Sequence, residues 1–322
     1  VQGYVFARLI GRGRRKKLFL TLSLVLSFAL LGYCKYADFF IENFNAVTGL
    51  SLPLLKIALP IGISFYTFQI ASYEIDVYRG DVAAQHNFID FAAYVAMFPQ
   101  LIAGPIVRYR DIAPQLKERT HSLDAAASGA SRFAVGLGKK VLVANVLAQL
   151  ISAYKTSAEQ TALYAWLYTI AFTLQIYFDF SGYSDMAIGL GRIFGFTFPE
   201  NFRYPYIAKS ITEFWRRWHM SLGTWFRDYL YIPLGGSRRG KWITVRNKLI
   251  VFFCTGLWHG AGWTYILWGL WHGVLVSGEG LLKAPIEKLR QKRGGRIVMH
   301  VYTLLAVILG FAMFRALSLI HI

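Results

Sequence analysis

The sequence predicts an all-helical protein that crosses a membrane several times, and three observations support this prediction. Apolar residues make up 55% of the 322 positions and charged residues only 16%, whereas soluble domains carry about 25% charged residues. Several apolar runs approach the ~20 residues that a transmembrane helix needs. Basic clusters lie between these runs, as the positive-inside rule expects of cytoplasmic loops. We therefore expect a multi-pass membrane protein.

The formal net charge of +18 also raises the question of nucleic-acid binding. A nucleic-acid protein gathers its basic residues on one hydrophilic face or arm. Here the clusters separate apolar segments instead, at residues 12–17, 108–119, 238–248 and 283–296. Contact with anionic lipid headgroups explains the charge more simply. We expect membrane lipids as partners and no nucleic acid.

The apolar runs predict about seven to nine membrane segments in one domain over residues 1–322, truncated at both ends. Segments are expected at residues 18–36, at 50–73 with Pro53 and Pro60 as kinks or start signals, at 132–154 partly at the interface, at 162–180, twice within 247–282, and at 300–317. Residues 91–107 are short and hold Pro99 and Pro105, so a bent or re-entrant segment is expected there. Residues 184–198 are rich in glycine, which favours a short helix packed closely on its neighbour.

Residues 214–230 have the pattern of an amphipathic helix at a membrane interface. At about 100° per residue, their aromatic and leucine side chains fall within an arc of roughly 160°, and Arg216, Arg217 and Arg227 take the other side. His219 falls inside the apolar arc, where an unpaired imidazole would be costly. A structural histidine bonded to a nearby carbonyl explains the pattern equally well.

Two histidines stand in the apolar, aromatic segment 257–273. Ionisable residues at membrane depth indicate function, although a histidine there can also simply cap a helix. On one continuous helix His259 and His272 would lie about 20 Å apart, and only a break at Gly260 or Gly262 would bring them closer. Histidine suits acyl transfer because a neutral imidazole, with a pKa of about 6.5, accepts the proton of an attacking hydroxyl.

Other reactive patterns are weak. The sequence contains no Gly-x-Ser-x-Gly elbow, and no set of cysteines, histidines and carboxylates is spaced for a metal, so we expect no metal site. We also expect no tightly bound cofactor. Asp179 and Asp185 flank Ser181 near a membrane segment, where they either line a path for an acceptor or have a structural role.

These residues resemble the membrane-bound O-acyltransferase (MBOAT) family, in particular its bacterial branch of alginate O-acetylation and teichoic-acid D-alanine transfer proteins. The matching stretches follow the family's order over most of the chain from about residue 50 to 273. They are residues 98–108, 175–189, 214–222, 226–236, Asn247 and 258–273. The family's usual Gly-Trp-Val-Phe-Phe-Arg pattern stands here as Gly-Phe-Ala-Met-Phe-Arg at residues 310–315.

The resemblance implies a multi-helix bundle with a funnel-like core in the bacterial inner membrane. It implies that His272 is the essential histidine, as general base or acyl-relay residue, and that His219 orients or polarises a reactant. His259, Asp179 and Asn247 are supporting candidates. The implied donor is acetyl-CoA or another cytoplasmic acyl thioester, and the implied acceptor is a hydroxyl of an exported polysaccharide. A separate extracytoplasmic acetyltransferase is the implied partner protein.

Two other functions stay open at this point. A transporter or acyl-group conduit without chemistry of its own would share the polar membrane interior and the bent helices. A membrane scaffold that recruits a separate acetyltransferase through its basic surface helix would depend on Arg216 and Arg217 more than on the histidines.

Overall fold

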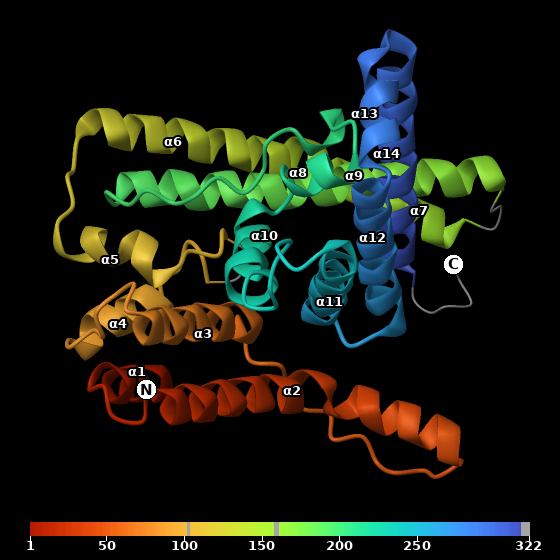
Figure 1. The fold of residues 1–322 in the computed structure, drawn as a ribbon. Coiled ribbons are helices and arrows are strands. Elements are labelled where there is room, and N and C mark those ends of the chain that lie inside the picture. Colours follow the sequence, from red (N-terminus) through yellow and green to blue (C-terminus); the bar gives the residue numbers. More distant parts are fainter. Residues whose placement is uncertain (102–103, 158–160, 317–322) are drawn as a thin grey trace. The chain divides into compact units, whose positions relative to one another are not determined.

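The computed structural model describes residues 1–101, 104–157 and 161–316, and every regular element in these ranges is a helix (Figure 1). This confirms the predicted all-helical fold class. The chain forms two compact units. Unit 1 comprises Val1–Gly129 and Leu190–Phe198, and unit 2 comprises Ala130–Gly189 and the chain from Pro199 onwards. That the chain is a single membrane domain stays a prediction.

Unit 1 is built on three helices that pack against one another: α1 (Gln2–Gly11), α2 (Lys16–Thr48) and α3 (Ile63–Arg79). Figure 1 shows α1 and α2 side by side, with α3 along them. Helix α2 ends at Gly49, whose left-handed conformation (φ 73°) lets the chain leave the helix.

The segment predicted over residues 50–73 is helical only from Ile63, shortly after Pro60, which was one of the two predicted kinks or start signals. Pro53 and Pro60 cannot donate helical hydrogen bonds. The Asp38 carboxylate instead accepts two backbone N–H groups of the preceding stretch, at 2.7 and 2.9 Å. These contacts hold it as irregular chain.

The predicted bent segment over residues 91–107 begins in α4 (Phe88–Val95) and is not a straight helix. After α4, its described residues contain no further helix, and the next one is α5 (Tyr109–Lys117). Residues 102–103 lie outside the described residues.

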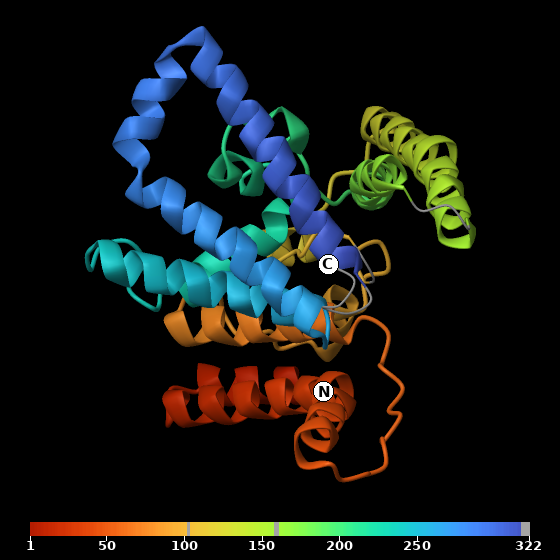
Figure 2. The same cartoon turned by 90° about the vertical axis from the view of Figure 1, so that its right-hand side faces the viewer.

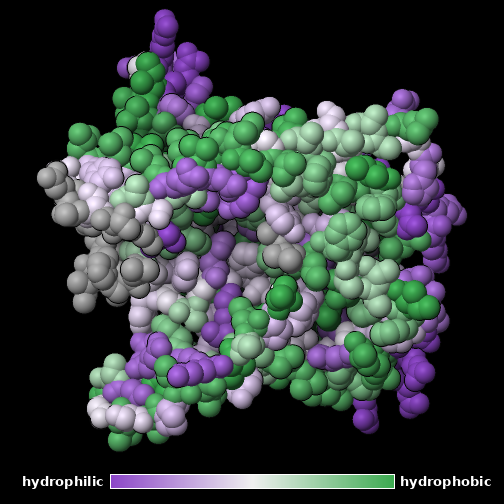
Figure 3. All heavy atoms as spheres, turned by 180° about the vertical axis from the view of Figure 1, so that it is seen from behind, coloured by the Kyte–Doolittle hydropathy of each residue, from purple (hydrophilic) through white to green (hydrophobic). Residues whose placement is uncertain are grey.

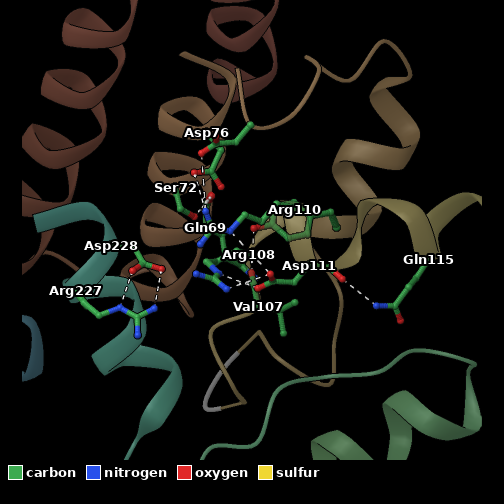
Figure 4. A network of polar contacts seen from close by, with 12 residues as sticks. Gln69, Ser72, Asp76, Val107, Arg108, Arg110, Asp111, Gln115, Arg227 and Asp228 are labelled. Carbon is green, nitrogen blue, oxygen red and sulfur yellow. Dashed lines mark hydrogen bonds and ion pairs between the residues drawn. The ribbon is translucent and has the colours of Figure 1, made fainter. Parts of the chain in front are cut away.

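Charged side chains tie α5 to α3 within unit 1 (Figure 4). Arg108 donates two hydrogen bonds to Asp111, at 2.8 and 3.1 Å. Arg110 lies 3.8 Å from the buried carboxylate of Asp76 on α3. The basic cluster at residues 108–119 therefore includes side chains that form ion pairs within unit 1.

Unit 2 contains the helical elements that follow α5, apart from the start of α6 and the end of α8, which belong to unit 1. They are α6 (Leu123–Gly138), η1 (Lys139–Ala144), α7 (Asn145–Thr156), α8 (Ala162–Ile193), η2 (Pro205–Ile207), α9 (Ile211–Trp215), α10 (Met220–Phe226), η3 (Arg227–Tyr231), α11 (Lys241–His259), α12 (Trp263–Leu281), α13 (Lys283–Gln291) and α14 (Arg293–Arg315). A boundary with unit 1 falls inside α6 and inside α8.

The separate short helix predicted over residues 184–198 is wrong, because α8 runs without interruption to Ile193. The chain leaves the helical direction at Gly195, with φ 76°. Close packing through glycine does occur, but earlier in the helix. A Cβ added at Gly182 would lie 2.8 Å from the carbonyl oxygen of Gly136 on α6.

The two segments predicted within residues 247–282 are confirmed as helices α11 and α12, which pack against each other (Figure 2). Glycine lets their backbones touch. A Cβ added at Gly269 of α12 would lie only 2.3 Å from the carbonyl oxygen of Phe252 on α11. Small residues at such positions allow the close helix approach that is common in membrane proteins.

Substitution of Gly269 by Ala is expected to destabilise this helix pair by about 1–3 kcal/mol. The added methyl group meets a backbone oxygen, which can retreat only if α11 moves. Gly278→Ala on the same helix is the matched control, because a Cβ there has no neighbour within 4 Å. Thermal unfolding of the detergent-purified protein measures both variants. Equal midpoints would show that the close contact does not hold the two helices together.

Among the described residues, three helical stretches are long and apolar enough to cross a membrane. They are Lys16–Thr48, Leu123–Tyr154 and Arg293–Arg315. They include the segments predicted at 18–36, 132–154 and 300–317, except that Leu317 lies outside the described residues. The other expected crossings stay predictions. Figure 3 shows broad apolar areas on one face, and large exposed apolar surfaces of this kind indicate contact with a membrane or a partner.

Candidate active site

The chain around His219 in unit 2 is not the single amphipathic helix predicted over residues 214–230. Helix α9 ends at Trp215, a turn follows, and α10 passes into the π-helical η3. His219 itself has φ 44°, a left-handed conformation that is uncommon for residues other than glycine. The prediction was wrong because regular periodicity cannot reveal this break. The ring is nevertheless buried, with 2% of its surface exposed.

Asn201 holds the His219 ring. The Asn201 Oδ1 atom lies 3.1 Å from Nδ1 of His219 and accepts the Ser221 hydroxyl at 2.9 Å. Phe180 and Trp258 flank the imidazole, with ring centroids 4.8 and 5.9 Å away. The other ring nitrogen, Nε2, is buried and makes no hydrogen bond within the described residues. A buried polar atom without a partner calls for a functional or structural explanation.

His272 lies on α12 and is 1% exposed. Its ring packs edge-to-face against the indoles of Trp215 and Trp268, with centroid distances of 5.1 and 5.3 Å. Its Nδ1 atom is buried without a hydrogen bond in the described part of the chain. Gly310 of α14 leaves room for the ring, since a Cβ there would come within 2.6 Å of Nε2.

His259 joins the other two histidines through shared indoles. Its ring lies 5.0 Å from Trp268, which also contacts His272, and 4.9 Å from Trp258, which also contacts His219. Helix α11 ends at His259 and α12 begins at Trp263, so His259 and His272 are not on one continuous helix. Tertiary packing therefore brings three predicted site residues into one aromatic cluster.

The other two candidates, Asp179 and Asn247, make different contacts. Asp179 forms an ion pair with Lys140 of η1. Asn247 is fully buried, and its side-chain N–H groups donate to two carbonyl oxygens in the turn at residues 234–236, at 3.3 and 3.0 Å. The polar contacts described for both residues stabilise structure.

Two cavities lie at the turn that carries His219. One, of about 530 Å³, is lined mostly by apolar side chains and includes Trp215, Arg216 and His219. The other, here named the polar cavity, of about 540 Å³, is lined by charged and polar side chains, including Asn201, together with apolar ones such as Ile188. Met220 lines both. The hydrogen-bonded pair of His219 and Asn201 thus has one member in the wall of each cavity.

Opposite charges are paired around the polar cavity. Arg132 donates to Asp185 at 2.8 Å and also binds Glu200, while Lys139 lies 2.6 Å from Asp185. Asp185, which the sequence left open between a path and a structural role, therefore lines a cavity as part of an ion-pair network.

Two residues that support this site were not predicted from the sequence. Asn201 precedes His219 by 18 positions, and nothing local marks an asparagine as the partner of a distant ring. Glu279 accepts the backbone N–H groups of Ile211 and Thr212, at 2.6 and 2.9 Å. It thereby holds the start of the helix that carries Trp215. An ionisable residue in the apolar segment of α12 is a signal that could have identified Glu279.

These features describe an all-helical membrane protein with two buried histidines, His219 and His272, the first of which lines a cavity. Residues 63–320 match the family model of MBOAT, the membrane-bound O-acyltransferase family. The chain belongs to this family, as its motifs predicted.

The chain is 50% identical over 306 residues to the probable alginate O-acetylase AlgI of Azotobacter vinelandii, covering 93% of this chain and 60% of that protein. It is 40% identical over 290 residues to the peptidoglycan O-acetyltransferase of Helicobacter pylori, covering 81% and 55%. It is 29% identical over 275 residues to the teichoic acid D-alanyltransferase of Bacillus subtilis, covering 81% and 70%. The chain thus spans about three fifths of the length of the alginate O-acetylase.

Substitution of Gly310 by Ala is expected to displace the His272 ring and to lower acyl transfer by about 10- to 100-fold, since small misplacements at a reacting centre are costly. The added methyl group would overlap Nε2. Gly294→Ala on the same helix is the control, because a Cβ there has no neighbour within 4 Å. Transfer rates are compared at equal amounts of membrane-inserted full-length protein. Equal rates for both variants would contradict a functional position of this ring.

Proposed function

We propose that this protein transfers an acyl group, specifically acetyl, from a cytoplasmic thioester to hydroxyl groups of an exported polysaccharide. Membership of the O-acyltransferase family supports acyl transfer, and two relatives with acetyl transfer in their names support the acetyl group. The single observation that supports this chemistry is the environment of His219. The side chain is a buried imidazole in the wall of a cavity, and its Nε2 atom makes no hydrogen bond within the described residues.

In the proposed reaction, His219 acts as the general base. An acceptor hydroxyl gives its proton to Nε2 while its oxygen forms a bond to the thioester carbonyl carbon. The carbon–sulfur bond then breaks, and the leaving thiolate takes up a proton. A positioned base contributes about 10²- to 10⁴-fold to such a step. Acetyl-CoA is the proposed donor, since it supplies acetyl as a thioester.

In this proposal His272 has the other role, which is to orient or polarise a reactant. Its ring contacts Trp215, and Trp215 lines the same cavity as His219. The family resemblance implied the reverse assignment, with His272 as general base or acyl-relay residue and His219 as the residue that orients or polarises a reactant. We favour His219 as the base because its Nδ1 is already bound to Asn201, which leaves only Nε2 for a reactant.

The proposal also includes a location and a partner. The relatives named alginate O-acetylase support a polysaccharide acceptor. An exported acceptor and a cytoplasmic donor require a protein in the bacterial inner membrane. A separate extracytoplasmic acetyltransferase is the proposed partner protein.

One observation favours a second candidate function, a conduit for acyl groups without chemistry of its own. The two cavities share Met220, and the paired side chains of His219 and Asn201 line one cavity each. Such an arrangement also suits passage from one cavity to the other. A conduit would move an acyl donor across the membrane but would form no ester.

The test uses the full-length protein in detergent, with labelled acetyl-CoA and a defined oligosaccharide. Base-labile label on the oligosaccharide, formed only when the protein is present, is the result expected of an acyltransferase. A parallel experiment complements a strain that lacks only this protein and so retains its partner, and it measures O-acetyl groups on the exported polysaccharide. Restored O-acetylation in cells without ester formation by the pure protein would favour the conduit. No restoration would contradict both functions.

A further inference from the structure

Asn201 lies at a junction of two loops in unit 2. It is fully buried, and its carbonyl oxygen accepts the N–H of Met220, at 3.0 Å. Its side chain contacts His219, which is the residue before Met220. We propose that Asn201 is a positioning residue that fixes the tautomer of His219 and leaves the lone pair on Nε2. This inference rests on the proposed function, in which Nε2 accepts a proton.

The orientation of the Asn201 amide follows from its neighbours. The backbone nitrogen of Ser221 lies 3.3 Å from one amide atom, and a backbone N–H can only donate. That amide atom is therefore the oxygen. The Ser221 hydroxyl donates to the same oxygen, and the amide nitrogen donates to the Ser184 hydroxyl at 3.1 Å. If the Asn201 amide were flipped, its NH2 group would face the backbone N–H of Ser221, and two donors would meet.

The orientation of the amide decides which nitrogen of His219 carries the proton. Because Oδ1 of Asn201 is an acceptor, Nδ1 of His219, 3.1 Å away, must be the donor. A neutral imidazole carries one N–H group, so Nε2 has a lone pair and no hydrogen. In the other tautomer Nε2 would carry the hydrogen and could not act as a base. A similar hydrogen bond fixes the tautomer of a metal-bound or catalytic histidine in other enzymes.

The backbone conformation of His219 also indicates that its ring is held in place. The left-handed φ of 44° at His219 is an unfavourable conformation for a non-glycine residue. Such conformations persist where the surrounding structure over-determines them, and they cluster at functional sites. Asn201 constrains the chain directly after His219. Its backbone oxygen accepts the N–H of Met220, and its side-chain oxygen accepts the N–H of Ser221.

The first test compares kcat and KM of full-length Asn201→Ala, Asn201→Asp and the control Asn87→Ala across pH. Asn201→Ala removes the acceptor, and we expect kcat to fall about 10- to 100-fold with little change in KM. Asn201→Asp keeps an acceptor but adds a negative charge that stabilises the imidazolium. The rising limb of the kcat profile should then move about one unit to higher pH. Asn87→Ala makes the same change at an exposed position of unit 1 and is expected to stay near wild type.

Other charges near the ring are the same in all these variants. Arg216 and Arg227 line the same cavity, and His259 acts electrostatically on His219. A shifted pH profile in Asn201→Asp alone therefore reports the new contact. Equal loss of kcat in the Ala and Asp variants, with an unmoved pH limb, would overturn the proposal and leave Asn201 a structural role. If Asn201→Ala fails to fold, the pH profile of Asn201→Asp decides by itself.

A second measurement does not depend on acyl transfer. Solid-state NMR of the full-length protein with ¹⁵N-labelled histidine separates protonated from unprotonated ring nitrogens. The signals of His219 are those that disappear in His219→Gln. We expect a protonated Nδ1 and an unprotonated Nε2, and the opposite tautomer would overturn the proposal. Failure of the proposed function alone would leave this spectrum unchanged, so the two failures are distinguishable.

Discussion

Substitution of His219 by Gln is expected to lower O-acetyl transfer about 10²- to 10⁴-fold, the usual contribution of a positioned general base. Glutamine is close in size to histidine and retains a polar group beside Asn201, so the buried site stays filled. Its amide nitrogen cannot accept a proton from an attacking hydroxyl. The loss should therefore appear in kcat, with the amount of protein in the membrane unchanged. O-acetyl groups on the exported polysaccharide and kcat of the purified full-length protein are the two measurements.

His86→Gln is the matched control for this substitution. His86 is exposed and lies in unit 1, so the same chemical change there should leave transfer at the wild-type rate. Wild-type acetylation by His219→Gln would refute the base role. A conduit would also be favoured by that result, because passage needs no proton acceptor.

Substitution of His272 by Ala is expected to lower acetylation by about 10²-fold or more, within the range for a group that acts in the reaction. The ring is buried between Trp215, which lines a cavity, and Trp268, so its removal takes away a buried polar group and also leaves a void. Void formation alone would reduce stability without a specific loss of kcat. Kinetic constants and the unfolding midpoint are therefore measured on the same full-length preparation.

His300→Ala controls for the loss of a buried ring. His300 lies on α14, is partly buried, and its Nδ1 atom lies 2.9 Å from the carbonyl oxygen of Ala208. Its removal costs one hydrogen bond away from the three clustered histidines. We expect a similar change in stability for both variants but a large loss of kcat only for His272→Ala. Normal acetylation by His272→Ala would remove this residue from the chemistry.

The helices of this protein were largely predictable where they are long and apolar. Helices α11 and α12 follow from two apolar runs separated by glycines, and the charges of the chain separate such runs throughout. Prediction failed at residues 50–62 and at the turn before α10. In the first case a distant carboxylate, Asp38, binds the backbone of the segment. In the second, one residue with positive φ interrupts an apparently regular amphipathic pattern.

The candidate site was likewise predictable only in part. His219, His259 and His272 stand out in the sequence because histidine is unusual in apolar, aromatic surroundings. Their grouping is not visible there, because it depends on Trp258 and Trp268, each of which contacts two of the rings. Local periodicity describes only neighbours along one helix, whereas these contacts join α11, α12 and the turn before α10.

By itself, the sequence determined that this is a helical membrane protein of the O-acyltransferase family, and it determined which histidines are candidates for the chemistry. Composition, segment length and ordered motifs are properties of the chain, and they need no folded structure. Only the tertiary structure decided that Asn201 holds His219, that Asp179 is paired with Lys140, and that His219 lines a cavity. Hydrogen bonds and cavities depend on atoms brought together from distant positions. Their geometry exists only once the chain has folded.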